Sequence, residues 1–169
     1  TMTTGVNNTL IGSLAGDALT TGSNNVAIGK EALSTEDANG TNTAVGHQSL
    51  STLNAGSDAY NVALGYRSGA VMTTGVQNTL IGGLAGDALT TGSKNVALGY
   101  QALTSEDAHG ENVAIGHNSL SNLNAGANGS NTALGFNSGY SMTTGTKNTI
   151  IGGLAGDALT TGSFNVALG

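Results

Sequence analysis

The residues of this chain that could carry out chemistry are carboxylates and histidines, most of which recur every 70 residues. The recurring acidic residues are Asp17, Asp87 and Asp157, together with Glu36, Asp37, Glu106 and Asp107. Calcium needs about six to eight oxygen ligands, and the Gly-Gly-X-Gly-X-Asp spacing of calcium-binding rolls is missing, so these residues indicate a solvated acidic face. His47 and His117 are too far apart along the chain to share a zinc ion. We therefore predict neither a metal site nor a cofactor.

Charge and composition argue against several classes of partner and activity. The chain has four basic and ten acidic residues, a net charge of -6, and no cysteine, proline or tryptophan. That charge repels phosphate backbones, so we expect no binding to nucleic acid. No apolar run approaches the roughly 20 residues that cross a bilayer, which predicts no membrane insertion of this segment. The scattered acids and the single arginine do not form the clustered site of a polysaccharide lyase or hydrolase, so we predict that the chain is not an enzyme.

Aromatic and histidine rings are the remaining candidates for binding. The candidate receptor-binding residues are His47, Tyr60, Tyr66, Tyr100, His117 and Phe136. All but Tyr60 directly follow a recurring glycine and would form an outward file that stacks on sugars. The alternative is that the rings cover corners of the coils or a seam between chains. Two-residue insertions within residues 54–60 and 124–130 predict loops, where recognition sites are common.

A five-residue motif that occurs ten times positions these residues: Asn, Thr or Val, a small or aliphatic residue, an aliphatic residue, and Gly. Its asparagines are Asn8, Asn25, Asn42, Asn61, Asn78, Asn95, Asn112, Asn131, Asn148 and Asn165. Successive copies are 17 or 19 residues apart, and every fourth copy returns after 70. A period nested in a longer period predicts a stacked solenoid. We expect an all-β parallel β-solenoid (a β-roll or β-helix) of about ten coils of 17–19 residues, forming a single domain over residues 1–169.

Each coil should begin with a strand of about four residues that ends at a glycine with positive φ. The turn glycines are Gly12, Gly29, Gly46, Gly65, Gly82, Gly99, Gly116, Gly135 and Gly152. We expect the asparagines to form a ladder in which one side-chain amide donates to the amide oxygen of the next coil. They should also occupy a turn position, because Asn tolerates the left-handed region. This role is structural, and we predict no ligand at the asparagines.

The side-chain sizes at two positions of the coil are inversely related. Where the third motif position is large, as at Leu10, the position six residues later is a glycine, as at Gly16; where it is alanine, the later position is often leucine. Two side chains that share one enclosed layer would show this exchange, so both should point inward. Two coils have small residues at both positions, and there we expect Met72 and Met142 to fill the gap.

The fourth motif position is aliphatic from coil to coil. If the third position points inward, the fourth forms an outward stripe, which would be buried against the same stripe of neighbouring chains. We therefore expect a homotrimer, intertwined or side by side. The opposite facing, with the fourth position inside, leads to the same oligomer because both faces of the strand are apolar. The sequence does not separate the two facings.

The motifs N-T-A-V-G, N-V-A-I-G and N-T-A-L-G resemble the N-S-V-A-I-G repeats in the heads of YadA-like trimeric autotransporter adhesins. They are more similar still to the tandem N-T-A-I-G and T-T-G repeats of phage tail fibre and related virion proteins, as in residues 131–135 and 143–145. The resemblance spans essentially the whole chain. It implies a trimeric β-solenoid fibre, displayed on a virus or outside a bacterium, that reaches or binds a host surface. The adhesin repeat is shorter, at about 14 residues, and prefers Ser where this chain has Thr or Val.

These observations predict a structural fibre shaft for host attachment, in which this segment is part of a longer fibre extended by 70-residue duplication. We expect a phage tail fibre or virion fibre at the virion surface, with a host glycan or protein as partner. A bacterial autotransporter-type adhesin at the cell surface is the alternative. An ice-binding solenoid is a remote alternative, because the threonine pairs at 20–21, 90–91 and 160–161 recur only on some coils. A polysaccharide-degrading β-helix is another.

Overall fold

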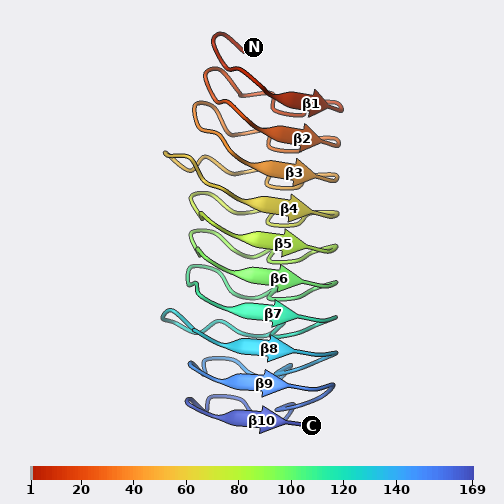
Figure 1. The fold of residues 1–169 in the computed structure, drawn as a ribbon, viewed down its shortest axis with the longest axis vertical. Coiled ribbons are helices and arrows are strands. Elements are labelled where there is room, and N and C mark those ends of the chain that lie inside the picture. Colours follow the sequence, from red (N-terminus) through yellow and green to blue (C-terminus); the bar gives the residue numbers. More distant parts are fainter. Residues whose placement is uncertain (1) are drawn as a thin grey trace.

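Ten three-residue strands, one in each coil, form a parallel sheet along the length of the molecule (Figure 1). The computed structural model describes residues 2–169. Strand order follows chain order, so each strand pairs with the strands before and after it. The strands are β1 (Thr9–Ile11), β2 (Val26–Ile28), β3 (Thr43–Val45), β4 (Val62–Leu64), β5 (Thr79–Ile81), β6 (Val96–Leu98), β7 (Val113–Ile115), β8 (Thr132–Leu134), β9 (Thr149–Ile151) and β10 (Val166–Leu168). The predicted all-β parallel solenoid is confirmed, and residues 2–169 contain no helix.

Equivalent residues of successive coils pair with one another. Thr9 pairs with Val26, and across a 19-residue coil Ala44 still pairs with Ala63. The two extra residues of the longer coils bulge outward on the side where the strands begin, before β4 and before β8 (Figure 1). The insertions therefore leave the register of the sheet unchanged.

Glycine ends every strand because the turn there excludes a side chain. The glycines that follow β1 to β10 have φ between 128° and 152°. A Cβ atom on Gly12 would lie 2.6 Å from the carbonyl oxygen of Gly29 in the next coil, and one on Gly29 would lie 2.5 Å from that of Gly46. The predicted turn glycines thus meet two separate requirements, a positive φ and close approach of the next coil.

The residue before each ladder asparagine is left-handed, whereas the ladder asparagines themselves are not, so the predicted turn position is wrong by one residue. Asn24 and Lys94 have φ of 61° and 62°. In this conformation the backbone N–H of Asn24 reaches the carbonyl of Val6, and that of Lys94 reaches the carbonyl of Val76, each at 3.0 Å. The left-handed region costs a non-glycine residue about 1–2 kcal/mol, which these hydrogen bonds between coils offset.

The third motif position lines the interior, which resolves the facing that the sequence left open. Ala27, Ala44 and Leu80 are fully buried, as is Leu33 on the opposite wall. A Cβ atom on Gly16 would lie 2.7 Å from Cδ2 of Leu10, so a large third residue and the glycine six positions later share one layer. The predicted exchange of volume is confirmed.

Met72 and Met142 are fully buried but supply only part of the predicted filling. A Cβ atom on Gly69 would lie 2.8 Å from Cδ1 of Leu80 and 2.9 Å from Cδ2 of Leu50, but 3.8 Å from Cε of Met72. Leucines of the neighbouring coils therefore occupy most of the space at Gly69. The prediction treated each coil alone, whereas stacked coils share one continuous core.

Candidate functional site

The ten asparagines form a continuous ladder inside the corner where each strand begins. From Asn25 to Asn165, each donates its backbone N–H to Oδ1 of the preceding ladder asparagine at 2.9–3.2 Å. Seven of them also donate Nδ2 to a backbone carbonyl 14 residues later, at 2.7–3.2 Å. The side chain thus satisfies two backbone groups per coil, which is a structural role.

The predicted bond between side-chain amides is present at only four rungs. Nδ2 donates to the preceding Oδ1 at Asn78, Asn131, Asn148 and Asn165, at 3.0–3.3 Å. From Asn8 to Asn148, Oδ1 already accepts a backbone N–H, which the prediction missed. The other amides instead point their N–H groups at main-chain carbonyls.

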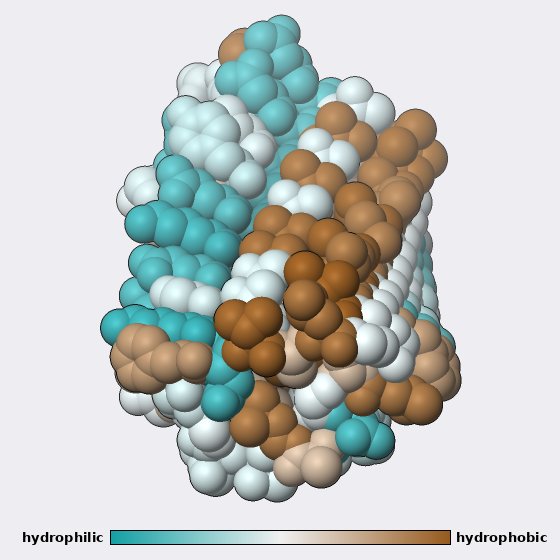
Figure 2. Space-filling model, turned by 60° about the horizontal axis from the view of Figure 1, so that its bottom comes forward, coloured by the Kyte–Doolittle hydropathy of each residue, from teal (hydrophilic) through white to brown (hydrophobic). Residues whose placement is uncertain are grey.

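An aliphatic stripe covers the outward face of the sheet. The fourth motif positions Leu64, Leu98 and Leu134, all in inner coils, remain 46%, 42% and 44% exposed. Figure 2 shows a band of hydrophobic side chains along the molecule with hydrophilic residues beside it. Contiguous exposed apolar surface of this kind marks a site of contact with another protein chain or ligand.

Five of the six candidate binding residues lie in the file that follows the strand glycines. His47 and Tyr66 stack with ring centroids 5.6 Å apart, and His117 stacks between Tyr100 and Phe136 at 5.5 Å from each. The rings therefore cover one another's faces, and only the outer faces of each stack are open to a ligand. Binding of sugars by this file stays a prediction.

Tyr60 is exposed and lies apart from that file, at the end of the loop before β4. The loop is held by the preceding coil. Glu36 accepts the N–H of Ala55 on Oε2 at 3.3 Å, and Asp58 accepts the N–H of Gly40 on Oδ1 at 3.1 Å. The insertion at residues 54–60 is thus tied down at both ends.

Glu36 and Glu106 are fully buried, so the predicted solvated acidic face is wrong for these two residues. Glu106 repeats the arrangement of Glu36: its Oε1 accepts the N–H of His109 at 3.3 Å and its Oε2 accepts that of Ala125 at 3.2 Å. Burial raises the pKa of Glu36 because the charged form loses water, while its hydrogen bonds act in the opposite direction. Each glutamate fixes the longer loop of the next coil.

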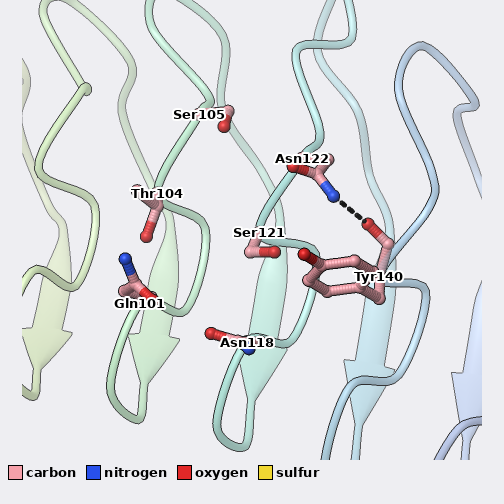
Figure 3. Close-up of a pocket in the computed structure, with 7 residues that line it drawn as sticks. All are labelled: Gln101, Thr104, Ser105, Asn118, Ser121, Asn122 and Tyr140. Atoms are coloured by element: carbon pink, nitrogen blue, oxygen red, sulfur yellow. Dashed lines mark hydrogen bonds between the residues drawn. The ribbon is translucent and has the colours of Figure 1, made fainter.

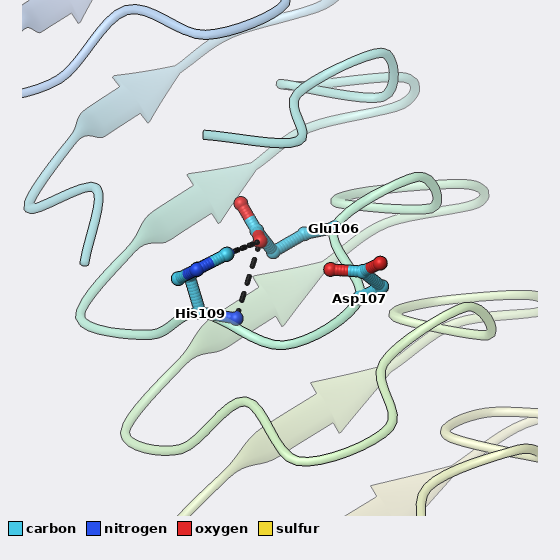
Figure 4. Close-up of side chains that lie close together, drawn as sticks. All are labelled: Glu106, Asp107 and His109. Atoms are coloured by element: carbon cyan, nitrogen blue, oxygen red, sulfur yellow. Dashed lines mark hydrogen bonds and ion pairs between the residues drawn. The ribbon is translucent and has the colours of Figure 1, made fainter. Parts of the chain in front are cut away.

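Glu106, Asp107 and His109 bring three possible metal ligands within 4.8 Å of one another (Figure 4). Nδ1 of His109 lies 3.2 Å from Oε1 of Glu106, and both oxygens of this carboxylate already accept backbone N–H groups. The 70-residue repeat of four coils is called the super-repeat. In the preceding super-repeat Asn39 takes the place of the histidine and donates twice to Glu36, at 3.2 and 3.1 Å. Because an amide serves equally well, we assign this cluster to anchoring of the loop.

Three of the six threonines considered for ice binding, Thr20, Thr90 and Thr91, use their hydroxyls within the fold. Oγ1 of Thr20 donates to the carbonyl of Asp37 at 3.2 Å, and Oγ1 of Thr90 donates to that of Asp107 at 2.9 Å. These hydroxyls therefore join neighbouring coils.

A half-open hollow of about 150 Å³ lies across the coils of β6, β7 and β8 (Figure 3). Its lining residues are Gln101, Thr104, Ser105, Asn118, Ser121, Asn122 and Tyr140. All are polar and none is charged. Their side chains converge on the hollow from three successive coils, with the Tyr140 ring at one end. The sequence analysis did not identify this site, although Tyr140 replaces Ala70 of the preceding super-repeat.

Comparison with family models, with curated proteins and with solved structures gave no match. Residues 2–169 contain no helix with the length and apolar character that spanning a bilayer requires. The proposed function therefore rests on the fold and on the exposed surfaces of the chain.

Proposed function

We propose that this chain is a shaft segment of an extracellular attachment fibre in which three copies associate through the aliphatic stripe. A phage tail fibre or other virion fibre is the parent that we favour, with attachment to a host surface as its task. The observation that carries the proposal is the stripe itself, which continues from coil to coil on the outer face of an otherwise closed solenoid.

The energetics of the stripe favour association. Full burial of a leucine or isoleucine side chain contributes about 1.5–3 kcal/mol. Leu64, Leu98 and Leu134 are each a little under half exposed, so covering one of them contributes about 1 kcal/mol per chain. The stripe residues between these leucines are partly buried and contribute less, and the pattern is the same in each of the three chains. The summed gain opposes the cost of association, which is about 4–15 kcal/mol for each of the two steps that join three chains.

The interior supports a mechanical role. Every coil is bound to the next through the parallel sheet, the asparagine ladder and further hydrogen bonds between turns. The stability of such a stack is a sum of contacts between neighbouring coils. Duplication of coils therefore lengthens the stack while the same contacts are kept. A rod of this kind keeps its two ends at a fixed separation, which a fibre shaft requires.

Multi-angle light scattering tests the oligomeric part of this proposal. We expect a mass of three times the 16.5 kDa of the chain. Leu98→Asp would place three carboxylates at the shared axis and should yield monomers, whereas Val71→Asp, at an exposed apolar residue away from the stripe, should remain trimeric. A monomeric wild-type chain would contradict the proposal.

Attachment is tested with the same samples. Fluorescently labelled wild-type trimer should bind to intact cells of a susceptible bacterial host, identified by screening a panel of strains. The monomeric Leu98→Asp variant should bind more weakly, because three linked copies gain avidity that one copy lacks. Absence of binding to every strain of the panel would count against attachment by this segment.

A further inference from the structure

We propose that the hollow across the coils of β6, β7 and β8 binds a single pyranose ring of a neutral carbohydrate chain. This inference rests on the proposed attachment function and gives it a ligand class and a location. The location differs from the file of stacked rings that the sequence indicated.

The unused hydrogen-bonding groups of the hollow are the first argument. Within residues 2–169, the amides of Gln101 and Asn118 and the hydroxyls of Ser121 and Tyr140 take part in no hydrogen bond. Beside the Ser121 hydroxyl, Nδ2 of Asn122 donates to the carbonyl of Tyr140 at 2.8 Å, whereas the equivalent carbonyl of Ala70 accepts the hydroxyls of both Ser51 and Thr52. These groups offer both donors and acceptors, which is what the hydroxyls of a sugar require.

The preceding super-repeat shows what the same place looks like when it is closed. There Glu31 and Gln48 occupy the positions equivalent to Gln101 and Asn118, and Nε2 of Gln48 donates to Oε2 of Glu31 at 2.7 Å. The equivalent of Ser121 is Ser51, whose hydroxyl donates to the carbonyl of Ala70 at 3.0 Å. In that super-repeat these polar side chains have hydrogen-bond partners within the protein.

Tyr140 supplies the second argument. It is 41% exposed and closes one end of the hollow with an aromatic ring and a hydroxyl, where the preceding super-repeat has only the methyl group of Ala70. An aromatic ring beside planar amides combines an apolar face for C–H groups with hydrogen bonds at the edge. Both features suit a pyranose ring.

Charge and size narrow the ligand further. The lining carries no charged side chain, which argues against phosphate, carboxylate or metal ligands. A volume of about 150 Å³ has room for the ring of one sugar, because an engineered cavity of this size in another protein holds benzene, and the hydroxyl groups can extend through the open side. The open side of the hollow lets the remainder of a sugar chain continue along the surface.

Saturation-transfer NMR with the purified chain in its own oligomeric state tests this inference, with glucose, galactose, mannose and N-acetylglucosamine as separate probes at millimolar concentration. We expect transfer to at least one sugar. Tyr140→Ala, and separately Gln101→Glu combined with Asn118→Gln, should weaken that binding by about tenfold or more. Both variants restore residues of the preceding super-repeat, so they should fold. Transfer to none of the four sugars, or unchanged binding by both variants, would overturn the proposal.

Two further variants locate the site and keep the two proposals separate. Phe136→Ala, in the file of stacked rings, should leave sugar binding unchanged; loss of binding here but not in Tyr140→Ala would place the site on the ring file and overturn the inference. The quadruple variant Glu31→Gln, Gln48→Asn, Thr52→Asn and Ala70→Tyr should create a second site and double the number of bound sugars. Light scattering on each sample reports the trimer independently, so a trimeric chain that binds no sugar would refute only the hollow.

Discussion

Asn95→Ala tests the asparagine ladder at an inner rung. Asn95 is fully buried, its Oδ1 accepts the N–H of Asn112 at 3.1 Å, and its Nδ2 donates to the carbonyl of His109 at 3.2 Å. Alanine would leave both main-chain groups buried without a partner, at about 1–3 kcal/mol each. We therefore expect a loss of about 2–6 kcal/mol in the free energy of unfolding.

Thermal denaturation measures this loss for the whole chain, and amide hydrogen exchange measures it at a single residue. For a chain of this length the melting temperature should fall by roughly 4–24 °C. Because coils of a solenoid open locally, loss of the hydrogen bond to the N–H of Asn112, at about 1–3 kcal/mol, should also make this amide exchange roughly 5 to 150 times faster than in the wild type. Asn54→Ala is the matched control, since Asn54 is exposed, and it should change stability by less than about 0.5 kcal/mol. A melting temperature equal to that of the control, with Asn112 still protected, would refute the structural role of the ladder.

Three further substitutions probe the turns, the core and the buried carboxylates. Lys94→Asn should raise the free energy of unfolding by about 0.5–1 kcal/mol, because the residue is left-handed and exposed and Asn24 already occupies the equivalent place; a decrease in a urea titration would contradict this. Leu80→Ala and Gly86→Leu should each cost about 2–4 kcal/mol, whereas the double variant restores a pair found in other coils and should melt above both singles. Burial raises the pKa of Glu36 above 4.5 in the folded chain, so the folded state binds more protons and the stability should fall as the pH rises just above that value. The urea midpoint of the Glu36→Gln variant should lack this part of the pH dependence. Parallel pH profiles of the wild type and the variant would exclude this effect of Glu36.

The sequence predicts the strands, their register and the inward positions because these features repeat. Each recurrence of the motif marks one strand, and the exchange between Leu10 and Gly16 identifies residues that meet inside the coil. The left-handed residues were harder to predict. Leu33 is buried with φ of 50°, which local propensity disfavours, and its N–H bond to the carbonyl of Ser49 in the next coil decides the conformation.

The buried glutamates and the hollow depend on differences between coils, which a search for repeats tends to set aside. Glu36 and Glu106 each occur one coil before a 19-residue coil, and that coincidence is the sequence signal for their role as loop anchors. Tyr140 is likewise visible as a departure from Ala70 in nearly identical surroundings. Neither contact could be predicted until the stacking placed residues from adjacent coils side by side.

Cysteine cross-linking tests the threefold association most directly, because the chain contains no cysteine of its own. Leu98→Cys places one thiol on the stripe, and Val71→Cys places one on an exposed surface away from it. Under mild oxidation in dilute solution we expect Leu98→Cys to form covalent dimers within trimers and Val71→Cys to stay unlinked. Equal cross-linking of the two variants, or none at Leu98→Cys together with a monomeric mass, would contradict the account.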